Sequence, residues 1–104
     1  MKQDLLKIIN NYGVMPQLKY FQSEVFELGE AIIKCEMELD VYSPKLGYND
    51  HQNHIAEEIA DVMVMLKQFQ HYYGIEDKEI EEVMKYKIER QLRRIENENK
   101  SNNN

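Results

Sequence analysis

Two long apolar seams dominate the middle of this chain. In both, the apolar residues recur at alternating steps of four and three, which is the spacing of one face of an α-helix packed along another helix. The first seam consists of Phe21, Val25, Leu28, Ile32, Cys35 and Leu39. The second seam consists of Ile55, Ile59, Val62, Leu66, Phe69 and Tyr73. The sequence therefore predicts two long helices that lie side by side.

Turn residues divide the chain into four helical segments. A short amphipathic helix ends at Gly13, and the second helix spans about 15–39. The third helix spans about 49–73 and is ended by Gly74, and acidic residues at 76–77 begin a fourth helix. No stretch has the alternation of a β-strand. We therefore expect an all-α antiparallel helical bundle with one short and three long helices.

The domain organisation is predicted to be simple. Residues 1–96 should form a single helical domain, whereas 97–104, a polar stretch rich in asparagine, should be a disordered tail. The fourth helix also has an apolar side, formed by Ile80, Met84, Ile88, Leu92 and Ile95. A chain of 104 residues with apolar seams on three helices exposes much apolar surface as a monomer. We therefore expect oligomerisation to complete the bundle.

The charge balance excludes several classes of partner. The formal net charge is -6, whereas binding to nucleic acid or to a membrane surface requires a cationic face. No apolar run approaches the roughly 20 residues of a membrane-spanning helix, and the N-terminus does not resemble a signal peptide. Cys35 is the single cysteine, so the chain has no internal disulfide. These features predict a cytoplasmic protein that binds neither nucleic acid nor membrane.

Four acidic residues border the two seams. Glu24 and Glu27 are three residues apart, as are Glu58 and Asp61, so each pair lies on one face of its helix. On neighbouring antiparallel helices the two pairs can converge, and oxygen ligands suit Mg²⁺. The alternative for the three glutamates is an ordinary solvated surface. Asp61 favours function, because the apolar residues 62–66 that follow it predict that it is poorly solvated.

Two histidines have a spacing that could bind a metal. His51 and His54 are three residues apart, but they lie at a predicted helix start beside a loop, which favours a surface position or a role at the edge of a substrate site. No glutamate is followed three residues later by a histidine, which excludes the Glu-x-x-His pattern of four-helix di-iron proteins.

The sequence around the acids resembles a known family. Residues 23–32 read SEVFELGEAI and residues 57–63 read EEIADVM. Both are similar to the ExxE and ExxD motifs of the MazG-like all-α nucleoside triphosphate pyrophosphohydrolases, in their usual contexts E-L-x-E-A-I and E-E-[LI]-A-D-V. The segment 87–90, KIER, resembles the family's K-[FI]-E-R, although Gln91 stands where many members have a second arginine. The resemblance spans roughly residues 15–96.

This resemblance implies hydrolysis of a nucleoside triphosphate to a monophosphate and pyrophosphate, by a homodimer or homotetramer. It implies Mg²⁺, or Mn²⁺, bound by Glu24, Glu27, Glu58 and Asp61. Either Glu24 or Glu27 would steer or deprotonate the attacking water. Lys87 and Arg90 would bind the triphosphate and neutralise the charge of the leaving pyrophosphate.

The sequence allows an alternative function and offers candidates for base recognition. The alternative to an enzyme is a non-catalytic helical module for oligomerisation or interaction, in which the acids are dispersed on solvated faces and magnesium has no effect. For an enzyme, the candidates for base recognition are Tyr42, Tyr48 and Asn49 in the loop between the second and third helices.

Overall fold

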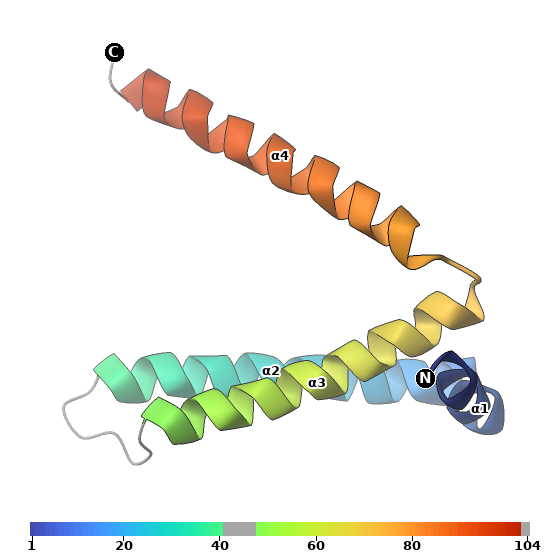
Figure 1. Ribbon diagram of the computed structural model, residues 1–104. Coiled ribbons are helices and arrows are strands. Elements are labelled where there is room, and N and C mark those ends of the chain that lie inside the picture. The colour runs from blue at the N-terminus through green and yellow to red at the C-terminus, as the bar shows by residue number, and fades with distance from the viewer. Residues whose placement is uncertain (41–47, 103–104) are drawn as a thin grey trace. The chain divides into compact units, whose positions relative to one another are not determined.

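The computed structural model describes residues 1–40 and 48–102, which form four α-helices (Figure 1). These are α1 (Lys2–Tyr12), α2 (Val14–Asp40), α3 (Tyr48–Tyr72) and α4 (Asp77–Asn102). No strand occurs in the described residues. The predicted all-α class, with one short and three long helices, is therefore confirmed.

Two glycines end the first and third helices. Gly13 has φ 94 and Gly74 has φ 67, which is backbone geometry that residues with a Cβ rarely adopt. The Gly13 N–H donates a hydrogen bond of 2.8 Å to the carbonyl oxygen of Ile9 and so completes the last turn of α1. Pro16 then lies in the first turn of α2, where its missing N–H has no helical acceptor to lose.

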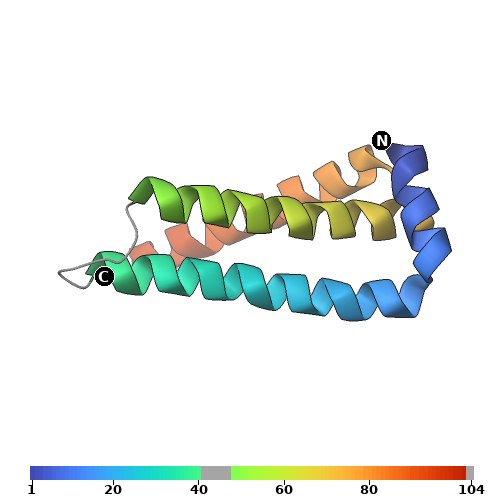
Figure 2. The same cartoon turned by 90° about the horizontal axis from the view of Figure 1, so that it is seen from below.

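Helices α2 and α3 lie side by side and run in opposite directions (Figures 1 and 2). Helix α1 lies across the end of this pair at which α2 begins and α3 ends, and it packs against both. Across the pair, the rings of Phe21 and Phe69 meet edge to face with centroids 5.7 Å apart. This is a favourable aromatic geometry that joins α2 to α3.

The interface between α2 and α3 differs from the predicted seams. Val25, Ile32, Ile59 and Leu66 are 42–50% exposed, although all four belong to those seams. On α2, the buried or half-buried positions include the seam residues Phe21, Leu28 and Cys35, together with Gln17, Glu24 and Ala31, which lie outside the seam. On α3, the buried or half-buried positions include the seam residues Ile55, Val62 and Phe69, together with His51, Glu58, Met65, Gln68 and Gln70, which lie outside the seam.

The physical reason is the width of the apolar arc on α2. The apolar residues of α2 cover a wider arc of the helix surface than one neighbouring helix can cover. Either half of this arc can therefore pack against α3. The half used here includes Glu24, so a carboxylate lies within the interface instead of beside it. The other half remains exposed, with Phe26 at 66%, Ile33 at 58% and Met37 at 64%.

The chain divides into two compact units, Met1–Tyr73 and Gly74–Asn104. The second unit is built from α4, and none of its side chains is buried through Asn102. The sequence predicted a domain ending at residue 96 and a disordered tail after it, whereas α4 continues to Asn102. An ion pair of 3.5 Å between Lys100 Nζ and Glu96 Oε1, one helical turn apart, supports this extension.

None of the helices in the described residues combines the length and apolarity that crossing a membrane would require.

Candidate metal centre and adjoining cavity

Three of the four predicted acids meet between α2 and α3. Glu24 and Glu27 on α2 and Glu58 on α3 each offer one carboxylate oxygen, and these three oxygens lie within 4.8 Å of one another. The spacing of Glu24 and Glu27 directs both side chains to one side of α2, and the antiparallel packing brings Glu58 opposite them. We refer to Glu24, Glu27 and Glu58 as the acidic trio.

The members of the acidic trio differ in exposure. Glu24 is only 5% exposed, Glu58 is half-buried and Glu27 is exposed. One oxygen of Glu24 (Oε2) and one of Glu58 (Oε2) are enclosed and have no hydrogen-bond partner among the described residues. An enclosed carboxylate oxygen without a donor is costly, and a cation is the partner that its charge favours.

Tyr20 holds the buried member of the trio. The Tyr20 hydroxyl donates a hydrogen bond to the Glu24 carboxylate, and this bond together with the Glu24 charge raises the pKa of Tyr20 above 10.0. Because Tyr20 lies one turn before Glu24 on α2, the bond orients the carboxylate from within the same helix.

Asp61 does not have the environment that its sequence neighbours predicted. Asp61 is exposed and lies outside the acidic trio. The prediction that the following apolar run would shield it is wrong, because Met63 and Val64 in that run are themselves 52% and 46% exposed. The negative charge of Asp61 nevertheless acts on the neighbouring residues, since it contributes to the raised pKa values of Tyr20 and Glu27.

Glu27 shows the electrostatic cost of bringing these acids together. The charge of Glu24 raises the pKa of Glu27 above 4.5, and desolvation and the charges of Glu58, Asp61 and Glu30 add to the effect. Like charges that share a site disfavour ionisation in this way. The trio is therefore a region of strong negative potential.

The raised pKa of Glu27 predicts how stability depends on pH without metal. Glu27 keeps its proton in the folded state at pH values where the unfolded chain has lost it, so acidification from neutral pH favours folding. The stability gained in this way is fully present below a pH of about 4.5, and it is lost as the pH rises through the raised pKa of Glu27. Melting temperatures in EDTA should therefore rise more on acidification for the wild type than for Glu27→Gln. Parallel curves for the two proteins would contradict this prediction.

The two predicted phosphate-binding cations lie on α4, in the second unit. Lys87 and Arg90 are both exposed. The Arg90 guanidinium lies 5.8 Å from the ring centroid of Tyr86, a cation–π distance. Lys85 instead lines a shallow depression on α4 together with Met84 and Ile88.

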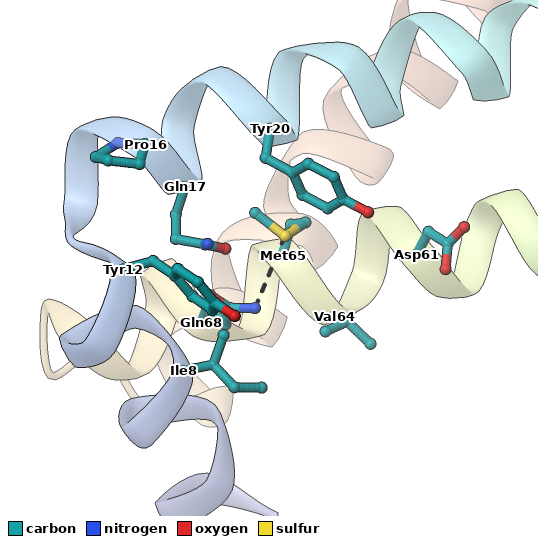
Figure 3. Close-up of a pocket in the computed structure, with 9 residues that line it drawn as sticks. All are labelled: Ile8, Tyr12, Pro16, Gln17, Tyr20, Asp61, Val64, Met65 and Gln68. Atoms are coloured by element: carbon teal, nitrogen blue, oxygen red, sulfur yellow. Dashed lines mark hydrogen bonds between the residues drawn. The ribbon is translucent and has the colours of Figure 1, made fainter.

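A cavity of about 520 Å³ lies among α1, α2 and α3, beside the acids (Figure 3). Asp61 lines it at one end, and Tyr20 lines it from α2. Two glutamines in its wall, Gln17 and Gln68, are buried, with exposures of 8% and 2%. The remaining wall is formed by Ile8, Tyr12, Pro16, Val64 and Met65.

Sequence reasoning did not identify this cavity. The available signal was weak: Gln68 is a polar residue two positions after the apolar run 62–66 of α3, and the charged Lys67 stands between them. The base-recognition candidate Tyr42 lies outside the described residues, as do the side chains of Tyr48 and Asn49. The predicted surface position of His51 is wrong, because only 3% of this residue is exposed. His54 is exposed as expected.

Comparison of the chain with family models, curated proteins and solved structures found no match. Its function is therefore inferred from the acidic trio, the cavity and the sequence motifs that contain them.

Proposed function

We propose that this protein is a Mg²⁺-dependent nucleoside triphosphate pyrophosphohydrolase that converts a (d)NTP and water to a (d)NMP and pyrophosphate. The observation that carries the proposal is the acidic trio, in which one carboxylate oxygen from each of Glu24, Glu27 and Glu58 lies within 4.8 Å of the others. An enclosed, unpartnered oxygen of Glu24 supports it. The MazG-like contexts of these residues, ELGEAI and EEIADV, support the same assignment.

The donor set fits a hard divalent cation. Glu24, Glu27 and Glu58 would hold Mg²⁺, with Asp61 completing the set from the edge of the cavity, and Mn²⁺ accepts similar oxygen ligands. The bound ion would supply positive charge to the phosphate oxygens and increase the acidity of a coordinated water. Histidine and cysteine are absent from the trio, which disfavours softer metals.

The acids have different roles in this proposal. Glu24, buried and held by Tyr20, is the fixed ligand that positions the others. Glu27, the exposed member of the trio, is assigned to steer or deprotonate the attacking water. Lys87 and Arg90 are assigned to the triphosphate, because a polyanion near these carboxylates requires cationic partners.

We also propose that the active protein is a homodimer or homotetramer. The exposed half of the α2 arc includes Phe26, Ile33 and Met37, and a Cβ added at Gly29 would meet no described atom within 4 Å. Helix α4 likewise exposes an apolar stripe with Met84, at 55%. Surfaces of this kind are typical of protein–protein contacts. The same observation favours the second candidate function, a non-catalytic oligomerisation or interaction module.

A panel of (d)NTPs with pyrophosphate detection tests the proposal, combined with thermal melts with and without Mg²⁺. We expect pyrophosphate release that requires Mg²⁺ and a melting temperature that rises with Mg²⁺ concentration. A ligand whose free concentration is 100 times its Kd adds about 2.7 kcal/mol to the free energy of unfolding, if it binds only the folded state. Absence of both turnover and a Mg²⁺ shift would favour the interaction module.

A further inference from the structure

Gln68 is buried in the cavity wall without adequate partners. It is 2% exposed, and its Nε2 lies 3.7 Å from the thioether sulfur of Met65, which is a weak acceptor (Figure 3). Its Oε1 is enclosed and has no hydrogen-bond partner among the described residues. Exchanging the amide nitrogen and oxygen would not help, since one of them would still lack a strong partner. A buried polar group in this state destabilises the fold unless a ligand satisfies it.

The rest of the wall is suited to a flat, partly polar molecule. Tyr12 and Tyr20 supply aromatic surface, and Ile8 and Val64 are among the apolar residues that surround them. Gln17, the second buried carboxamide, comes from α2 and lies across the cavity from α3 (Figure 3). Apolar and aromatic walls with a few polar groups are typical of small-molecule sites of about 300–1,000 Å³.

The cavity adjoins the acidic trio through two shared residues. Tyr20 lines the cavity while its hydroxyl hydrogen-bonds to Glu24. Asp61 lines the cavity from α3, on the side toward which the Tyr20 hydroxyl points (Figure 3), and its charge contributes to the raised pKa of Glu27. A molecule that occupies the cavity can therefore extend its polar end toward the acids.

We propose that this cavity binds the nucleobase of the substrate, with the carboxamides of Gln68 and Gln17 hydrogen-bonding to the polar edge of the base. That the phosphates of the same molecule extend toward the acidic trio rests on the proposed hydrolase function. A carboxamide presents a donor and an acceptor side by side, and it therefore complements a heterocycle edge with an adjacent donor and acceptor. An acyl chain would leave the Gln68 carbonyl unsatisfied.

The test compares Gln68→Met with Gln52→Met, a matched change at an exposed glutamine of the same helix. Gln68→Met should lower kcat/KM for the preferred (d)NTP by about tenfold or more, mainly through KM, because lost hydrogen bonds to the base weaken binding. Hydrolysis of inorganic tripolyphosphate, which has no base, should not change. The ligand-free variant should melt at the same or a higher temperature, because it no longer buries an unpartnered amide. Gln52→Met should match the wild type throughout.

Two results separate this inference from the hydrolase itself. If Mg²⁺-dependent (d)NTP hydrolysis occurs and Gln68→Met leaves its kcat/KM unchanged, the cavity is not the base site, and the hydrolase proposal stands. If no triphosphate is hydrolysed, binding of free nucleosides can be followed by tyrosine fluorescence, since the chain has no tryptophan. Saturable nucleoside binding that Gln68→Met abolishes would support the cavity assignment alone, and absence of binding would overturn it.

Discussion

Replacing Glu24 with glutamine should abolish Mg²⁺-dependent hydrolysis while making the metal-free protein more stable. Glu24 is the most buried acid of the trio, and its enclosed Oε2 has no partner among the described residues. Glutamine keeps the shape but removes the charge that repels Glu27 and Glu58, so folding without metal becomes easier. Activity should fall by more than about a hundredfold, since changing residues that merely support a metal ligand already costs about 10–100-fold.

Pyrophosphate release and thermal melts in EDTA and in Mg²⁺ measure both parts of this prediction. The Mg²⁺-induced rise in melting temperature should be largely lost in Glu24→Gln. Glu36→Gln is the control, because Glu36 is an exposed glutamate on the same helix outside the trio. A Glu24→Gln protein with wild-type activity and a wild-type Mg²⁺ shift would show that the trio is not the metal centre.

Alanine at Lys87 or at Arg90 should lower turnover by about tenfold or more, whereas alanine at Lys85 should not. Lys87 and Arg90 are three residues apart and share a face of α4. Lys85 is two residues from Lys87 and so projects from a different side. A phosphate contact that strengthens in the transition state contributes about 1.4 kcal/mol for each factor of ten in rate. All three residues are exposed, and such surface changes usually alter stability by less than about 0.5 kcal/mol.

Steady-state kinetics on the three variants, with melting temperatures for each, checks this result. Unchanged melting temperatures would exclude loss of fold as the cause of lost activity. Equal and small effects at all three positions would mean that the basic stretch of α4 is a solvated face, and another source of positive charge for the triphosphate would then be required.

The two predictions test separate parts of the proposal. Glu24 belongs to the first unit, and Lys87 and Arg90 belong to the second. Loss of activity at both would show that the two units act in one reaction. Loss at Glu24 alone would keep the metal centre and remove α4 from the chemistry.

The sequence by itself determined the helices and the spacing of the acids. Apolar periodicity and the glycines at 13 and 74 predicted four helices, because helix formation depends on residues only three or four apart and on local backbone preferences. The same local regularity placed Glu24 and Glu27 on one side of α2, close enough for their carboxylates to meet. The end of α4 was not predicted, since its final turns are polar and lack an apolar pattern.

Only the tertiary structure decided which side chains are enclosed. The sequence selected Asp61 as the poorly solvated acid, but Glu24 occupies that position. A wide apolar arc does not by itself fix the rotation of a helix about its axis. The rotation of α2 decides which of Glu24 and Glu27 is the less exposed, and the rotation of α3 decides the same for Glu58 and Asp61. The roles of Gln17 and Gln68 likewise depend on tertiary packing. Both line a cavity that forms where α1 packs against α2 and α3, so its walls come from residues distant in sequence.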